Sequence, residues 1–222
     1  RGSEMKTKKT VYYILMYLPL VIVLIALPYL PEKIPAHYGF DNQVDRWGNK
    51  YEALLFPIIS LLMGYFLLRM AKLAAKQEEH GENNKNVTII VGILLLVLFN
   101  ALNAYSLYTS FNKVENLSSV SLDIGQLVFG IIGVLMIVLG NVMPKLRMNS
   151  TIGLRTPWSM KNEVIWKKCQ HIGGISFIIG GIIIIGICIA MKGTSCLLSV
   201  LGVWAILIVI DVFLTYIVAK RN

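Results

Sequence analysis

Long runs of apolar residues alternate with short polar segments along this chain. Six of these runs come close to the ~20 residues that a helix needs to cross a bilayer at ~1.5 Å per residue. They lie at about Val11–Leu30, Ala53–Leu68, Val87–Tyr108, Ile124–Met143, Ile172–Met191 and Leu197–Ala219. A backbone in lipid must satisfy its own hydrogen bonds, which favours helices. The pattern predicts an all-α, polytopic integral membrane protein with six transmembrane helices.

Composition agrees with a membrane protein. Hydrophobic residues make up 56% of the 222 positions, and charged residues only 15%. Soluble domains carry roughly 25% charged residues, so this chain lacks the polar surface that water requires. The net charge of +9 has two possible meanings, because basic residues can bind nucleic acid or anchor a membrane protein.

The distribution of Lys and Arg predicts the orientation. Sixteen of the 21 lie in the N-terminus, the second and fourth loops and the C-terminus, and five in the other three loops. By the positive-inside rule we expect both termini in the cytoplasm. The net positive charge is then an anchoring charge, and we expect no nucleic-acid partner.

The fourth loop, residues 144–171, is then cytoplasmic and contains NSTIGLRTPWSMKNEVIW at 149–166. Basic residues and an interfacial Trp there are ordinary anchors, but this does not explain the crowding around Arg-Thr-Pro-Trp. Pro157 disfavours helix at the residue before it, and Gly153 permits backbone shapes closed to other residues. Ser159 is a candidate N-cap with Glu163 in the first turn. We therefore predict a turn followed by a short amphipathic helix, through residues 164–169, lying on the inner membrane surface.

Two stretches resemble a known family. GNVMPKLRMNSTIGLRTPWSMKNEVIW, residues 140–166, closely resembles the signature of the SdpI membrane proteins. LPEKIPAHYGFDNQVDRWGNK, residues 30–50, resembles the outer-loop module common at the N-terminus of that family. The resemblance implies a two-span module at residues 1–86, with outer loop 31–52, and an SdpI-like four-span module at 87–222.

Two positions depart from the family pattern. Asn42 stands where we expect glycine, although Asn tolerates a left-handed turn. Gln170 stands where the family often has histidine, and His171 comes one position late. No histidine role is therefore carried over to this chain.

The resemblance implies a bacterial cytoplasmic-membrane protein that gives immunity against a secreted, membrane-active toxin. It also implies a receptor that holds a transcriptional repressor at the membrane once toxin is engaged. Residues expected to bind that inner partner are Asn149, Gly153, Arg155, Thr156, Pro157, Trp158, Glu163 and Trp166. Residues expected to face the toxin are Pro35, His37, Asp41, Asp45, Trp47 and Lys50. The toxin's identity, the presence of a repressor and the oligomeric state stay open.

The outer loop leaves a metal site open. His37, Asp41 and Asp45 recur every four residues and would share one face of a helix, an arrangement that suits the ligands of a hard cation. Prolines and glycines around them break a helical pattern, which favours solvated turn residues instead. Tyr38 and Trp47 could form an aromatic patch at the outer interface. We expect no metal and no cofactor.

Two other function classes fit the sequence less well. An intramembrane enzyme would need a reacting group, and no span contains a histidine that could activate Ser176 in GGISF, residues 173–177. Small residues at Ser176/Gly180 and Gly186/Ala190 more simply predict close helix packing. A small-solute or peptide transporter is the nearer alternative, because polar residues occur within the spans, but no internal repeat is evident.

Asp211 is the one formal charge inside a predicted span. Such residues face the bundle interior and have partners. Arg69 and Arg155 are candidates for an ion pair. The alternative is a protonated Asp211 that is hydrogen-bonded to a neighbouring helix.

Overall fold

The computed structural model describes residues 2–39, 41–77, 81–149 and 153–221. Within them, six helices are long and apolar enough to cross a membrane. This confirms the six-span prediction. They are α1 (Gly2–Ala26), α2 (Leu55–Gln77), α3 (Gly81–Phe111), α4 (Ile124–Val142), α5 (Glu163–Ala190) and α6 (Gly193–Arg221). Short 3-10 turns join them at η1 (Leu27–Tyr29), η2 (Lys50–Leu54), η3 (Leu117–Ser119) and η4 (Met143–Lys145).

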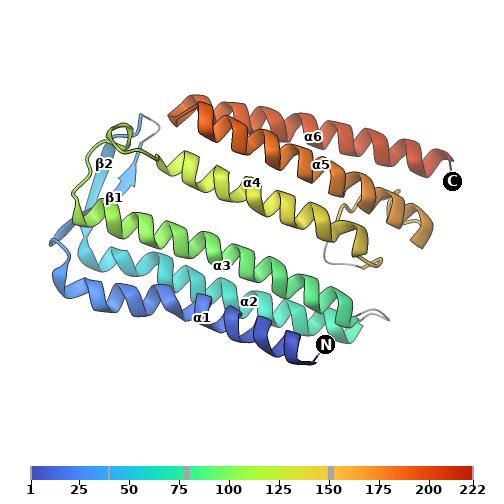
Figure 1. The fold of residues 1–222 in the computed structure, drawn as a ribbon, viewed down its shortest axis with the longest axis horizontal. Helices are drawn as coiled ribbons and strands as arrows, with labels where there is room; N and C mark the ends of the chain where they lie inside the picture. Colours follow the sequence, from blue (N-terminus) through green and yellow to red (C-terminus); the bar gives the residue numbers. More distant parts are fainter. Residues whose placement is uncertain (1, 40, 78–80, 150–152, 222) are drawn as a thin grey trace.

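The helices form one elongated bundle with two halves (Figure 1). α1, α2 and α3 pack together, α4, α5 and α6 pack together, and α3 also contacts α4. Both termini lie at one end, called here the loop end, beside the α4–α5 connection. A two-stranded sheet lies at the other end, called here the hairpin end. An even number of spans requires this placement of the termini.

The sheet is an antiparallel hairpin of β1 (Lys33–Tyr38) and β2 (Val44–Asn49) that the all-α prediction did not include. The helical alternative for His37, Asp41 and Asp45 is therefore wrong. The favoured turn interpretation fits Asp41, whereas His37 and Asp45 lie on the two strands. Asn42 adopts φ 64° in that turn, which is the left-handed conformation that Asn tolerates where glycine was expected.

The first half has an apolar core along its length. Tyr12 and Met16 of α1 are fully buried with Ala71 of α2 and with Ile89 and Leu96 of α3. The Tyr12 hydroxyl donates to the Gly64 carbonyl oxygen at 2.7 Å, which satisfies its only polar atom inside the bundle. This hydrogen bond joins α1 to α2 within the apolar core.

In the second half, α4 and α5 approach each other through glycines. A Cβ added at Gly174 would lie 2.6 Å from the Gly140 carbonyl oxygen, and one at Gly133 would lie 2.9 Å from the Gly181 carbonyl oxygen. Small residues let helix backbones come close in lipid, where hydrophobic burial supplies no driving force. Of the small residues chosen from sequence, Gly180 packs against Leu207, but Gly186 has no atom nearby and faces outward.

The α4–α5 connection differs from the prediction of a separate interfacial helix. The residues expected to form that helix are the first turns of α5, which runs without a break from Glu163 to Ala190. Its N-cap is Asn162, whose Oδ1 accepts from the Ile165 amide at 2.9 Å. Ser159 is not the cap. Glu163 does occupy the first turn, where a carboxylate suits the helix dipole.

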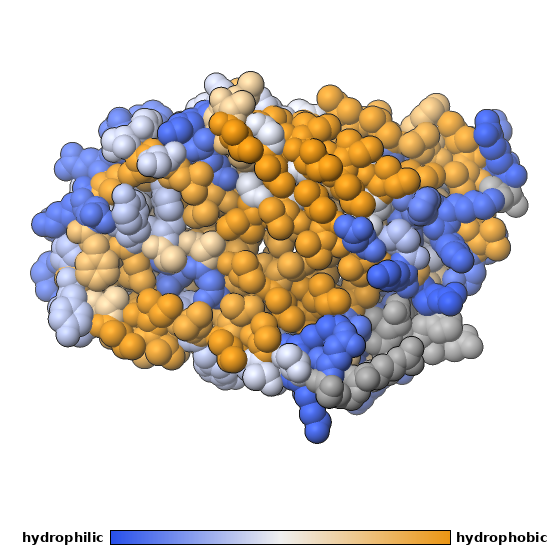
Figure 2. Space-filling view, in the orientation of Figure 1, coloured by the Kyte–Doolittle hydropathy of each residue, from blue (hydrophilic) through white to orange (hydrophobic). Residues whose placement is uncertain are grey.

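Hydrophobic and hydrophilic residues occupy separate regions of the surface, as expected for a membrane-spanning protein. Figure 2 shows a hydrophobic band over the helices and hydrophilic residues gathered at both ends. Many large apolar side chains on α1, α2, α5 and α6 are exposed. In water such a surface would be unstable, so these faces are suited to lipid.

The orientation can be checked by cysteine labelling. We expect Lys33→Cys, exposed on β1, to react with an impermeant maleimide in intact cells. Lys161→Cys, exposed in the α4–α5 connection, should react only after lysis. The unmodified chain is the background control, because its three cysteines are free and buried. Labelling of Lys161→Cys but not Lys33→Cys in intact cells would reverse the orientation.

Candidate functional site

At the hairpin end, the hairpin is joined to the α3–α4 connection. The Val44 amide donates to the Glu115 carbonyl oxygen at 2.9 Å, and the Leu117 amide donates to that of Asn42 at 2.9 Å. The Tyr38 hydroxyl donates to the Val114 carbonyl oxygen at 2.8 Å, and burial raises the pKa of Tyr38, which keeps this donor protonated. The hairpin is therefore fixed over the bundle by backbone and side-chain bonds.

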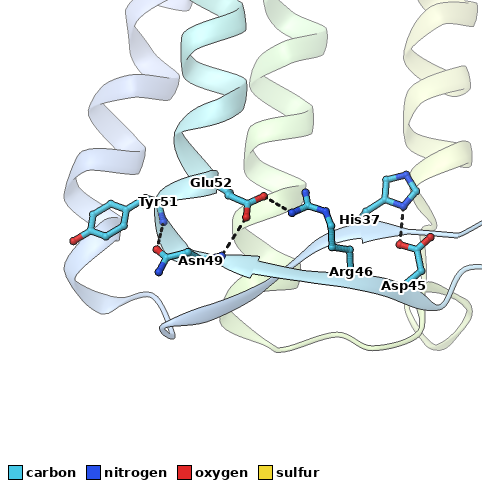
Figure 3. Close-up of polar contacts among 6 residues, drawn as sticks. All are labelled: His37, Asp45, Arg46, Asn49, Tyr51 and Glu52. Atoms are coloured by element: carbon cyan, nitrogen blue, oxygen red, sulfur yellow. Dashed lines mark hydrogen bonds and ion pairs between the residues drawn. The ribbon is translucent and has the colours of Figure 1, made fainter.

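His37 and Asp45 lie at the part of the hairpin nearest α4 (Figure 3). The His37 Nδ1 and Asp45 Oδ1 atoms are 2.7 Å apart, and both side chains are largely exposed. Arg46 forms a 2.8 Å ion pair with Glu52, and Glu52 also accepts from the Asn49 amide. The contacts of Glu52 with Arg46 and Asn49 anchor the hairpin to η2. The His37–Asp45 pair takes no part in them and faces the second half of the bundle.

A cavity of about 290 Å³ lies between the hairpin and the second half. The strands and turn contribute His37, Tyr38, Gly39, Asn42 and Asp45 to its lining, and the helices contribute Asp123, Ile124, Gly125, Phe129, Gly193, Thr194 and Leu197. One carboxylate and an imidazole therefore line the hairpin side of the cavity, and the helix side combines Asp123 with the apolar Ile124, Phe129 and Leu197. Such a mixture suits an amphipathic ligand.

Asp123 holds together the helix ends below this cavity. Its Oδ1 accepts from the Gln126 amide at 2.8 Å as the N-cap of α4. Its Oδ2 accepts from the Gly193 amide at 2.7 Å, at the start of α6. Gln126 Nε2 in turn donates to the Cys188 carbonyl oxygen at 2.7 Å, near the end of α5. The Asp123 carboxylate thus joins α4 to the start of α6, and the Gln126 amide joins α4 to α5.

At the loop end, residues 153–162 form a folded segment, called here the RTPW loop. The Thr156 amide donates to Ser159 Oγ at 2.8 Å, and the Ser159 amide donates to Thr156 Oγ1 at 3.1 Å. Ser159 Oγ also lies 3.0 Å from the Leu154 carbonyl oxygen, to which it can donate. Ser159 is fully buried. Its role is to close this turn, which replaces the capping role inferred from the sequence.

Gln170 of α5 fixes the start of the RTPW loop. Its Oε1 accepts from the Leu154 amide and its Nε2 donates to the Leu154 carbonyl oxygen, both at 2.9 Å. Gly153 has φ 118°, and a Cβ there would lie 2.6 Å from Gln170 Oε1. Glycine is required at this position on both counts. Gln170 can make this two-way contact because an amide both donates and accepts.

The tryptophans tie the RTPW loop to the helices. Trp158 Nε1 donates to Thr215 Oγ1 of α6 at 2.9 Å, and its ring packs edge-on against Tyr216 with centroids 5.7 Å apart. Trp166 is fully buried and donates from Nε1 to the Leu146 carbonyl oxygen at 3.0 Å. Trp166 is therefore a core residue, and its side chain is not exposed to the inner partner that it was expected to bind.

Arg155 differs from its neighbours. Its side chain is exposed, and it makes no hydrogen bond or ion pair with any other residue that the structure describes. Pro157 and Glu163 are also exposed, whereas Asn149 is buried and donates from Nδ2 to the Arg147 carbonyl oxygen at 2.8 Å. Residues 150–152 of the predicted inner loop lie outside the described residues. The loop is anchored from within and presents a guanidinium outward.

Asp211 is buried beside Ser176 at the α5–α6 interface. In the described part of the chain, neither Arg69 nor Arg155 lies within ion-pair distance of it. The ion-pair hypothesis is therefore wrong for these residues. Thr215 Oγ1 lies 2.7 Å from the Asp211 carbonyl oxygen, to which it can donate, and Thr215 also receives the Trp158 bond. Asp211 thus lies one helical turn from the anchor of the RTPW loop.

The predicted site residues separate into groups. Of the outer residues, His37 and Asp45 line the cavity, while Asp41 Oδ1 accepts from the Gln43 amide within the turn. Pro35 and Trp47 pair across the strands, and Lys50 forms a 2.8 Å ion pair with Glu32 at the hairpin's base. Among the described residues, no group of three His, Cys, Asp or Glu side chains could hold a metal ion.

Asp123 is not among the residues predicted from the sequence, and Gln170 is noted there only as a departure from the family pattern, without a role. Asp123 and Gln126 have the spacing of a capping box at the start of an apolar run, so that signal was readable. It would not have revealed the bond to Gly193. Gln170 gave no local signal, because its partner Leu154 lies 16 residues away and is paired through backbone atoms.

Comparison with known proteins supports the resemblance. Residues 145–219 match the SdpI/YfhL protein family, and residues 14–61 match a family described as a domain of unknown function, DUF1648. Immunity protein SdpI of Bacillus subtilis (strain 168) is 25% identical over 178 residues, which cover 80% of this chain and 79% of that protein. No solved structure matches. The resemblance to SdpI proteins is confirmed, and the chain is a multi-pass cell membrane protein.

Proposed function

We propose that this chain, which resembles an immunity protein along most of its length, protects a bacterium from a secreted, membrane-active toxin. The toxin binds at the hairpin end, and the RTPW loop reports its presence to a repressor protein in the cytoplasm. The observation that carries the proposal is that each end of the bundle has an ordered, partly polar surface. One is a mixed polar and apolar cavity, and the other is a braced loop with an outward guanidinium.

The cavity suits a peptide that enters from the membrane surface. Phe129, Ile124 and Leu197 offer apolar contacts on the helix side, while Asp45 and His37 offer polar ones on the hairpin side. A membrane-active peptide is amphipathic, with an apolar face and a polar face. The cavity of about 290 Å³ would hold a part of that apolar face, against Phe129, Ile124 and Leu197.

A connected path joins the two surfaces. Asp123 and Gln126 bind the hairpin end of α4 to the α5–α6 turn. α4 and α5 then pack through backbone contacts between glycines, so they move as one body. At the loop end, α5 carries Gln170, which holds the RTPW loop. Displacement of the α4 end by toxin would therefore shift the position of the RTPW loop.

Survival of a sensitive host tests the toxin-binding part. The host is a Bacillus subtilis strain that lacks its own Immunity protein SdpI. It is exposed to the killing factor that the unmodified parent strain secretes. We expect the wild-type chain to protect it. His37→Ala/Asp45→Ala should lower the tolerated toxin concentration by about tenfold or more, because central interface contacts are each worth roughly 2 kcal/mol or more.

The matched control is Lys33→Ala/Glu115→Ala, which also removes one basic and one acidic group from the same end. Neither residue lines the cavity, and both are exposed. Protection should be retained at equal expression. Equal protection by both double variants would place toxin recognition elsewhere, and a wild-type chain without effect would contradict immunity toward this killing factor.

A further inference from the structure

A second groove lies at the loop end, on the outer side of α5. Its volume is about 680 Å³, within the range of ~300–1,000 Å³ typical of ligand sites. It is lined by Pro144, Arg147, Glu163, Val164, Lys167, Lys168, His171, Ile172 and Val218. Neither the hairpin-end cavity nor the exposed side of the RTPW loop is part of it. This set of residues is called here the basic groove.

The basic groove concentrates positive charge from two segments. Arg147 comes from the chain that follows η4, and Lys167, Lys168 and His171 come from α5. Glu163 is the one acidic residue of the lining. No described acidic side chain forms an ion pair with Arg147, Lys167 or His171. A phosphate group placed here would meet the cationic side chains of Arg147 and Lys167 and the imidazole of His171, none of which forms an ion pair with a described acidic side chain.

Apolar surface continues from the groove along α5. Val164 in the lining is 60% exposed, and Ile175, Ile179 and Ile182 are 48%, 51% and 58% exposed. With Lys168 and Ile172, these isoleucines recur every three or four residues, so they share one face of the helix. The groove thus has a charged end at the loop end of the bundle and an apolar stripe that runs into the membrane span.

We propose that the basic groove binds an anionic phospholipid of the inner leaflet. The phosphate lies between Arg147, Lys167 and His171, and an acyl chain lies along the isoleucine stripe of α5. Charge complementarity favours this occupant, because basic pockets beside transmembrane helices on the cytoplasmic side suit anionic head groups. The apolar stripe favours a lipid over a free phosphate, which would leave that stripe without a partner.

The bound lipid would also brace the RTPW loop. The Arg147 carbonyl oxygen accepts from Asn149 Nδ2, and Glu163 begins α5 immediately after the loop. A head group held between Arg147 and Lys167 therefore ties the chain before the loop to the helix after it. Lipid binding and the position of the RTPW loop are then linked.

Native mass spectrometry of the full-length chain in detergent tests the site. The probes are 1-palmitoyl-2-oleoyl phosphatidylglycerol and the matching phosphatidylcholine. The wild-type chain should bind phosphatidylglycerol more tightly. Arg147→Gln/Lys167→Gln should weaken that binding by roughly 25-fold, at about fivefold for each basic residue near the membrane surface, and leave phosphatidylcholine binding unchanged.

The control is Lys9→Gln/Lys72→Gln, which removes two exposed basic residues from the same end of the bundle. It should keep the preference for phosphatidylglycerol. An equal loss in the control would mean diffuse attraction and overturn the site, as would displacement of the lipid by millimolar inorganic phosphate. A groove variant that keeps the lipid preference but loses a transcriptional response would make the groove a protein-docking surface and would also overturn the proposal.

Discussion

Gly181→Leu is expected to destroy the packing of α4 on α5. A Cβ at Gly181 would collide with the Gly133 carbonyl oxygen. A backbone oxygen cannot turn away as a side chain can, so the two helices would have to separate. Overpacking costs about 1–3 kcal/mol and occasionally more. We expect a lower midpoint of thermal unfolding in detergent and less folded protein in the membrane.

The matched control is Gly186→Leu on the same helix. No heavy atom lies within 4 Å of a Cβ at Gly186, which is exposed. Leucine also has a better helix propensity than glycine, by up to about 1 kcal/mol. The control should therefore unfold at the wild-type temperature or slightly above it. Equal midpoints for the two leucine variants would show that the close approach of α4 and α5 does not support the fold.

Arg155→Lys is expected to abolish signalling to a repressor while leaving toxin immunity in place. The exposed guanidinium has no partner among the described residues, so its planar set of donors is available to another protein. Lysine keeps the charge but loses that geometry. Hydrogen bonds to a charged group are worth about 1.5–3 kcal/mol, which is roughly 10- to 100-fold in partner affinity.

The measurement is induction of a reporter that the repressor controls, with toxin survival recorded in the same cells. Lys161→Ala is the control, because Lys161 is exposed in the same RTPW loop and its removal should preserve induction. Gln170→Ala should also lose induction. In that variant protease should cut the RTPW loop faster than in the wild type, because Leu154 loses its hydrogen bonds to Gln170. Full induction in Arg155→Lys would show that only the positive charge of Arg155 matters, and would contradict a role for its planar donors.

Sequence patterns were sufficient where one physical requirement dominates. Apolar runs at Val87–Tyr108 and Ile172–Met191 are long enough for lipid, and the structure has helices over both. The requirement for Gly153 was also readable, because few residues tolerate φ 118°. The start of α5 was not, since Ser159 and Asn162 are equally good caps in isolation. Ser159 instead bonds to Thr156, and only Asn162 is left to cap the helix.

The sequence alone therefore determined the class of the protein, its six spans, the charge asymmetry between its ends and the unusual composition of residues 149–166. Each depends on residues that are neighbours in the chain or lie on one helix. Only the tertiary structure decided that His37 and Asp45 face a cavity with Phe129, that Asp123 joins α4 to Gly193, and that Gln170 holds Leu154. These contacts depend on how the helices pack. Packing brings together atoms whose positions no local pattern encodes.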